Sequence, residues 1–67
     1  MEVQITKDRV VTVTGAAGRW TVRENGIELG NVFTTRRFGY TYWKRSGSKE
    51  LFTRRADAIS SLVLRSN

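Results

Sequence analysis

Apolar and polar residues alternate over most of the first 45 residues, which is the pattern of strands that bury one face. The predicted strands cover about residues 2–14, 19–24, 27–34 and 38–45. Lys7-Asp8 interrupts the first of these, so residues 2–14 form either a short hairpin or one long bent strand. With turn residues between the strands, the alternation predicts an antiparallel sheet of three to five strands.

The clearest turn signal is Asn25-Gly26, which lies between two alternating runs and favours a type I′ hairpin turn. Gly30 follows in the second of these runs, just before Val32 and Phe33 break the alternation. A glycine at such a place indicates a β-bulge or the close approach of another part of the chain.

The last predicted strand, 38–45, has four aromatic residues in six consecutive positions, and a turn at 35–37 is expected to lead into it. Neighbouring residues of a strand point to opposite faces, so Tyr42 and Trp43 lie on different ones. Tyr42 shares its face with Phe38, Tyr40 and Lys44, and Trp43 shares its face with Thr41 and Arg45. The pattern leaves open which of the two faces is buried.

A C-terminal helix is predicted over about residues 54–65, with Thr53 as its N-cap. Its apolar stripe consists of Ala56, Ile59, Leu62 and Val63. The helix is expected to cover one face of the sheet, which gives a single α+β domain, 1–67. The predicted core contains Trp20, Leu29, Phe52, Ile59, Leu62 and Val63. Phe33 is likewise expected in the core rather than on a ligand platform, and Leu51-Phe52 forms either a short strand or a plug.

The chain has 12 basic and 6 acidic residues, and its whole excess charge of +6 lies between residues 36 and 55. A clustered excess produces a directed positive potential, for which the simpler alternative is a solvated basic rim. Because the window also carries aromatic rings, it predicts phosphate contacts from the cations and base contacts from the rings. The candidate nucleic-acid-binding residues are Arg36, Arg37, Tyr42, Trp43, Lys44, Arg45, Lys49, Arg54 and Arg55.

Arg54 and Arg55 lie where the helix is predicted to begin, and the helix macrodipole disfavours cations there. An anion bound near the helix start would reverse this penalty. The alternative is that the penalty is small at an exposed position and is tolerated.

The sequence offers little for catalysis. It has no histidine and no cysteine, which removes the commonest general base near neutral pH, the commonest zinc ligand and any thiolate. We therefore predict no enzymatic activity, no cofactor and no metal site. Without a signal-peptide pattern or an apolar run of about 20 residues, the expected location is cytoplasmic, with the nucleoid as one place within it.

From Trp20 to Leu62 the layout resembles the small sheet-plus-helix DNA-binding domains of the AP2 and integrase arm-binding type. The resemblance rests on Gly39-Tyr40-Thr41-Tyr42-Trp43 as a strand, and on Leu51-Phe52-Thr53 followed by Arg54-Arg55-Ala56-Asp57-Ala58-Ile59 as the entry into a helix. It implies that the sheet face away from the helix enters the major groove of DNA. The groove contacts that it implies are Arg36, Arg37, Trp43 and Arg45.

Together these patterns predict a small, basic, non-enzymatic protein that binds nucleic acid, with DNA favoured over RNA, as a monomer or homodimer. The alternative is a protein–protein adaptor or inhibitor, of the phage or mobile-element type, that places the same basic surface on an acidic protein partner.

Overall fold

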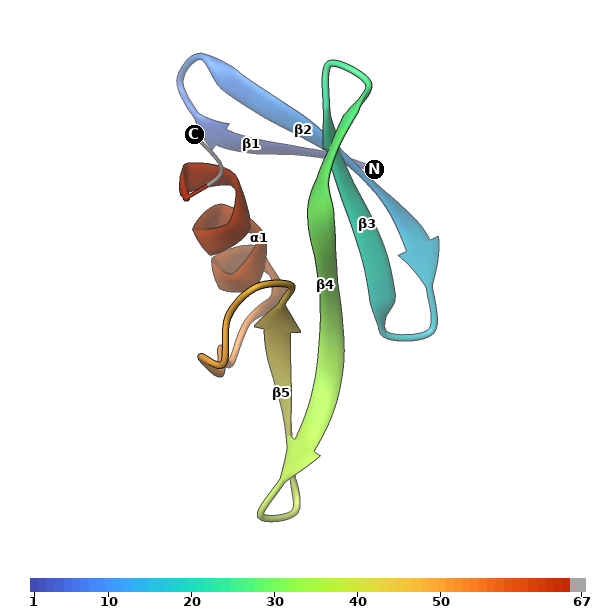
Figure 1. The fold of residues 1–67 in the computed structure, drawn as a ribbon, viewed down its shortest axis with the longest axis vertical. Helices are drawn as coiled ribbons and strands as arrows, with labels where there is room; N and C mark the ends of the chain where they lie inside the picture. The colour runs from blue at the N-terminus through green and yellow to red at the C-terminus, as the bar shows by residue number, and fades with distance from the viewer. Residues whose placement is uncertain (66–67) are drawn as a thin grey trace.

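The computed structural model describes residues 1–65 and shows five strands and one helix within them (Figure 1). The elements are β1 (Glu2–Thr6), β2 (Arg9–Ala16), β3 (Arg19–Glu24), β4 (Ile27–Arg37), β5 (Tyr40–Arg45) and α1 (Arg55–Leu64). Each strand pairs antiparallel with the next, so the sheet is a meander in the order β1-β2-β3-β4-β5. The predicted α+β class, a small antiparallel sheet with one C-terminal helix, is confirmed.

The strand boundaries differ from the prediction at two places. Residues 2–14 are a hairpin that turns at Lys7-Asp8, and its second strand runs on to Ala16. β4 continues through 35–37, where the sequence predicts a turn, and the chain turns at Phe38-Gly39 instead. The predicted turn at Asn25-Gly26 is confirmed, with positive φ angles of 54° and 81° at its two residues.

A β-bulge in β4 decides which of its later side chains face the helix. The register of β3 with β4 shifts so that Leu29 is an extra residue on β4. A shift of one residue moves every following side chain to the other face of a strand. Val32 therefore faces α1 and is fully buried, whereas Phe33 points to the opposite side.

Gly30 lies beside this bulge and has a φ of 154°. A Cβ atom there would lie 2.4 Å from Ser46 Oγ and 3.0 Å from Leu62 Cδ1. Both the bulge and the close approach that the sequence indicates at Gly30 are present. The absence of a side chain lets α1 and the chain after β5 come close to β4 at this point.

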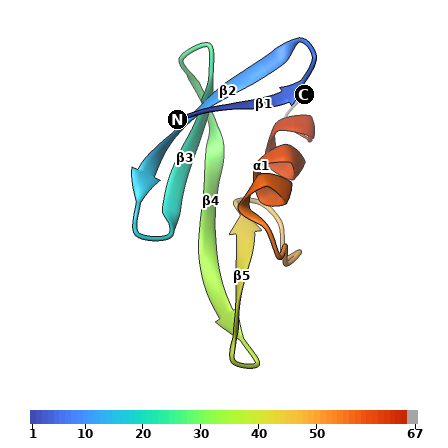
Figure 2. The ribbon, with the colours of Figure 1, turned by 180° about the vertical axis from the view of Figure 1, so that it is seen from behind.

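The core lies between α1 and one face of the curled sheet, and Figures 1 and 2 show the helix on that side only. We call this the inner face and its opposite the outer face. The buried side chains are Val11, Val13, Val22, Val32, Ala58, Ile59, Leu62 and Val63.

The predicted core is confirmed in its helical part and incomplete in its sheet part. Ile59, Leu62 and Val63 are buried as predicted. Trp20, Leu29 and Phe52 pack against the core but stay partly exposed. Four valines of β2, β3 and β4 supply the sheet side of the core, and none of them was predicted.

Two predictions about the helix are wrong. Ala56 is exposed, and Ala58 takes its place in the buried stripe. The N-cap residue is Arg54 rather than Thr53, with extended backbone angles and no hydrogen bond from its side chain. The helix therefore begins one residue later than a Thr53 cap would place it.

Phe52 fulfils both alternatives that the sequence leaves open for its segment. It forms an isolated antiparallel bridge with Trp43, in which the two N···O distances are 2.7 and 2.8 Å. Its ring also packs against the core. This bridge ties the segment before α1 to β5.

Candidate nucleic-acid interface

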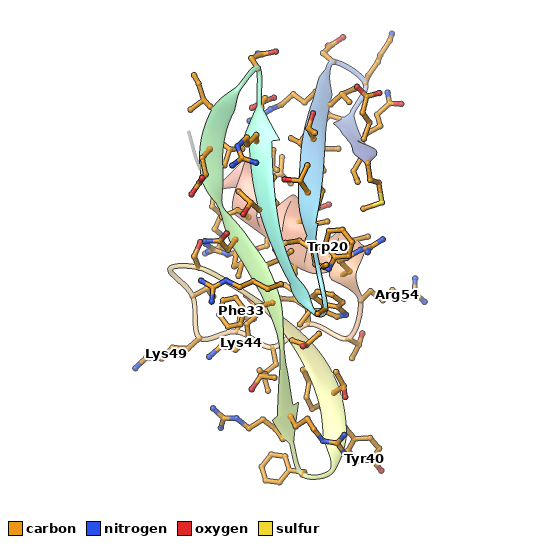
Figure 3. The ribbon with its side chains drawn as sticks, turned by 90° about the vertical axis from the view of Figure 1, so that its right-hand side faces the viewer. Trp20, Phe33, Tyr40, Lys44, Lys49 and Arg54 are labelled. Carbon is orange, nitrogen blue, oxygen red and sulfur yellow. The ribbon has the colours of Figure 1, made fainter. Side chains whose placement is uncertain are left out.

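A strip of cations and aromatic rings runs over β3, β4 and β5 on the outer face, which α1 does not cover (Figure 3). Direct cross-strand partners point to the same face, so the strand register identifies the members of the strip. We call it the outer strip. It consists of Arg19, Phe33, Arg37, Tyr40, Tyr42 and Lys44.

The first row of the outer strip crosses three strands. Arg19 on β3 pairs with Phe33 on β4, and Phe33 pairs with Lys44 on β5. Figure 3 shows Phe33 and Lys44 close together, with α1 behind the sheet. Because direct partners have Cβ atoms about 5 Å apart, the ring is flanked by one cation on each side. A base can stack on such a ring while the cations contact phosphates.

Two further rows follow toward the β4–β5 turn. Thr35 lies opposite Tyr42, and Arg37 lies opposite Tyr40. Tyr42 is half-buried, whereas Arg37 is exposed and Tyr40 is 68% exposed. The outer strip thus becomes more exposed toward the end of the hairpin.

The part of the outer face that carries the strip holds no carboxylate. No acidic residue occurs between Glu28 and Glu50 in the sequence. Glu28 lies 3.6 Å from the guanidinium of Arg23, at the other end of the outer face. Thr21 and Asn31, joined by a hydrogen bond of 2.9 Å, separate that pair from the strip. The cations of the strip therefore keep an uncompensated positive charge.

Trp43 and Arg45 lie on the inner face, contrary to what the resemblance to AP2-type domains implies for them. Trp43 packs against the core and bridges to Phe52. Arg45 donates hydrogen bonds to Ser61 Oγ at 2.9 Å and to the carbonyl of Ser46 at 3.1 Å. Both side chains hold the helix and its preceding loop against β5.

The remaining predicted residues are spread around the molecule. Lys49 is exposed in the loop after β5, and Figure 3 shows it and Arg54 on opposite sides of the molecule. The guanidinium carbon of Arg55 lies 5.1 Å from the centre of the Trp20 ring, at cation–π distance. Arg55 is thus partly engaged on a ring, and Arg54 is the exposed cation at the helix start. The basic window that is continuous in sequence does not form one continuous surface.

The β4–β5 hairpin extends past the end of α1 and forms the far tip of the molecule (Figure 1). Arg36 is exposed near this tip, on the side of the ribbon that carries Trp43 and not the outer face that the resemblance implies for it. Its Nη2 donates a hydrogen bond of 3.3 Å to the carbonyl of Gly39. Phe38 occupies the turn itself and is 90% exposed. The tip thus combines two arginines, Arg36 and Arg37, with a ring that packs against nothing in the core.

Sequence reasoning missed Arg19 and misplaced Phe33. Arg19 lies outside the basic window, among charges that balance in the sequence. Phe33 reaches the outer face only because of the bulge beside Gly30. The strand register can be counted outward from the Asn25-Gly26 turn, where Glu24 pairs with Ile27. With one extra residue at the bulge, this count places Arg19 opposite Phe33, so the turn and the bulge glycine together could have identified the pair from the sequence.

The ion pair between Arg9 and Glu24 is separate from the outer strip. Arg9 Nη2 lies 2.7 Å from Glu24 Oε1, and Arg9 Nε donates to Oε2 at 3.1 Å. These hydrogen bonds lower the pKa of Glu24 and raise that of Arg9, while desolvation opposes both shifts. Both groups remain charged at neutral pH, and each compensates the other.

Among residues 1–65, no cluster of three or more His, Cys, Asp or Glu side chains could hold a metal ion, and no pocket opens at the surface. The described part of the chain has no helix long and apolar enough to cross a membrane. The sequence matches none of the protein-family models, curated proteins or solved structures with which it was compared.

Proposed function

We propose that this chain is a non-enzymatic protein that binds nucleic acid, preferably duplex DNA, through the outer strip and the β4–β5 hairpin. The observation that supports this most is the outer face itself. It aligns three cations and three aromatic rings in cross-strand rows, over a region without a carboxylate. Cations supply phosphate contacts, and rings supply contacts to bases.

The positions of the rings support a binding role because rings outside the core contribute little to the stability of the fold. A domain of 67 residues has few large side chains with which to build a core. Phe33, Tyr40 and Tyr42 nevertheless lie on the face that α1 leaves open. Rings beside cations on an open face are well suited to contact a partner.

The shape of the hairpin supports DNA as the preferred partner. A two-stranded β-ribbon fits the major groove of B-DNA, which is about 12 Å wide. The major groove of an A-form RNA helix is too narrow and deep for side chains to read. The exposed hairpin beyond α1 is a ribbon of this kind (Figure 2).

Only part of the predicted residue set belongs to the proposed interface. Arg36, Arg37, Tyr42 and Lys44 are retained, and so is Lys49, which is exposed in the loop after β5. Arg19, Phe33 and Tyr40 are added from the strand register. The residues that we leave out, because they pack inside or lie on the other side of the molecule, are Trp43, Arg45, Arg54 and Arg55.

The salt dependence of DNA binding tests this proposal. With about four to five phosphate contacts, the affinity for a 20-bp duplex of mixed sequence should fall with salt at a log–log slope of roughly −3.6 to −4.5. Replacing Arg19, Arg37 and Lys44 together with glutamine should reduce the magnitude of this slope by about 3. These side chains lie on the open face, so thermal melting should stay nearly unchanged.

The matched control replaces Lys7, Arg54 and Arg65 with glutamine, which removes the same charge from exposed positions outside the interface. Arg9 is unsuitable as a control because it is paired with Glu24. The control should leave the salt slope close to that of the unmodified protein. Equal changes in both variants would contradict a localised interface. Binding of an acidic protein without binding of any nucleic acid at low salt would favour the adaptor role instead.

A further inference from the structure

Phe38 occupies the first position of the two-residue turn between β4 and β5. Its φ is 56°, and that of Gly39 is 81°. Two successive positive φ angles are typical of a type I′ turn, which suits the twist of a hairpin. Glycine, asparagine and aspartate are the usual residues there, whereas a bulky side chain at positive φ is an outlier.

The chain itself shows what it uses elsewhere in the same kind of turn. Ala17-Gly18 joins β2 to β3 with a φ of 55° at its first residue, and Asn25-Gly26 joins β3 to β4 with 54°. Both have a small or turn-favouring residue where the β4–β5 turn has phenylalanine. Ala17 is not one of the three usual residues either, but the β4–β5 turn alone among these three turns places a large side chain at this position.

Burial does not compensate for this departure. Phe38 is 90% exposed and does not belong to the side chains packed against the core. A backbone that disfavours the residue, together with an apolar ring left in water, is unfavourable for the isolated protein. Strain that the fold does not require suggests a role in binding.

The surroundings of the ring indicate what it binds. Arg36 and Arg37 precede it, Tyr40 follows it, and no acidic residue lies between positions 28 and 50. A Cβ atom on Gly39 would meet nothing within 4 Å, so the turn is unobstructed. The hydrogen bond from Arg36 to the carbonyl of Gly39 braces the turn from its own strand.

We propose that Phe38 is a wedge that inserts between adjacent base pairs when the β4–β5 hairpin lies in a groove of duplex DNA. This inference rests on the proposed function, since the arginines beside the ring would hold the hairpin on the phosphates. Apolar side chains at the tip of a DNA-bound element unstack a base step and kink the duplex. The cost of unstacking is smaller where the stack is already interrupted.

The test uses two variants. Phe38→Asn introduces the residue type that the Asn25-Gly26 turn has at the same position, and Phe38→Leu keeps an apolar side chain. The unmodified protein should bind a duplex with a central one-nucleotide gap about tenfold or more tightly than the intact duplex. It should also raise the fluorescence of 2-aminopurine placed in the contacted step. Phe38→Leu should retain both effects in part. Phe38→Asn should lose both, melt at the same or a higher temperature, and still bind the intact duplex.

The outcomes separate this inference from the proposed function. If the unmodified protein binds no duplex, the proposed function fails and the wedge fails with it. If the protein binds duplex but Phe38→Asn keeps the gap preference and the fluorescence change, only the wedge is overturned. A lower melting temperature for Phe38→Asn would also overturn it, because the ring would then stabilise the fold. If the protein binds phosphatidylglycerol vesicles in a way that depends on Phe38, and the fluorescence of 2-aminopurine does not change, the tip is a membrane anchor instead.

Discussion

The two faces of the sheet differ in what their apolar side chains pack against. On the inner face Val11, Val13, Val22 and Val32 are fully buried, and both tryptophans, Trp20 and Trp43, pack partly exposed against the core. The outer face of the same strands carries Phe33, Tyr40 and Tyr42 beside cations.

The fully buried sheet positions are all valines because the layer between sheet and helix is thin there. One helix of ten residues lies close against a curled sheet, and Gly30 leaves space for Leu62 where they meet. Small β-branched residues fill such a thin layer without overpacking it. Phe33, Tyr40 and Tyr42 do not belong to the side chains that pack against this core, so their effect should be on binding rather than on folding.

The largest expected effect is the loss of stability on truncating a core side chain, compared with truncating a ring on the outer face. Ile59→Ala should lower the free energy of unfolding by about 2–4 kcal/mol, because Ile59 is 1% exposed in the core. Phe33→Ala, which removes a larger side chain from the outer face, should lower it by less than about 1 kcal/mol. Urea unfolding measures both values. A larger loss for Phe33→Ala than for Ile59→Ala would reverse the assignment of the two faces.

The bulge that separates the faces is tested by Gly30→Ala. The added methyl group should cost about 1–3 kcal/mol, because it meets Ser46 Oγ and Leu62. Ser46 cannot move freely, since its Oγ accepts a hydrogen bond of 3.1 Å from the backbone N–H of Asn31.

The control for this prediction is Gly26→Ala, at a φ of 81° with nothing within 4 Å of the new Cβ. It adds backbone strain without crowding, so the difference between the two urea melts isolates the close approach at Gly30. Equal losses in the two variants would mean that the structure around Gly30 adjusts without cost.

The smallest expected effect concerns the Arg9–Glu24 ion pair, whose side chains are 24% and 20% exposed. Hydrogen bonds from Arg9 lower the pKa of Glu24, so folding is favoured above the pKa of the unfolded carboxyl, about 4.3. This contribution is lost as the pH falls through the lower pKa of the folded state. Glu24→Gln should therefore melt below the unmodified protein at pH 7, and the difference should shrink toward pH 3. A difference that stays constant over this range would show that the charge of Glu24 contributes nothing.

Local sequence signals were sufficient for several parts of the fold. Asn25-Gly26 predicted its turn because a type I′ turn needs two residues that tolerate positive φ. The helix and three of its buried residues followed from helical spacing, since one side of a helix must pack against the sheet. The alternation of β5 also predicted that Tyr42 and Lys44 lie on one face of the strand and Trp43 and Arg45 on the other, and the register confirms this.

Other features depended on contacts between distant parts of the chain. The sequence left both faces of β5 open, and the pairing of β4 with β5 turned Trp43 inward. The bulge beside Gly30 moved Phe33 outward, because one extra residue reverses the facing of all that follow. Arg19 joined the strip through the same register, although it is far from the basic window in sequence.

The basic window shows why charge along a chain does not by itself define a surface. Within β5, Lys44 and Arg45 are neighbours in sequence but lie on opposite faces, because successive side chains of a strand alternate. Arg55 is turned onto Trp20 by the position of α1. The sequence by itself thus determined the elements, the turn chemistry and the presence of an excess positive charge. Only the tertiary structure decided which cations share a face with which rings, since strand register and helix packing are set by long-range contacts.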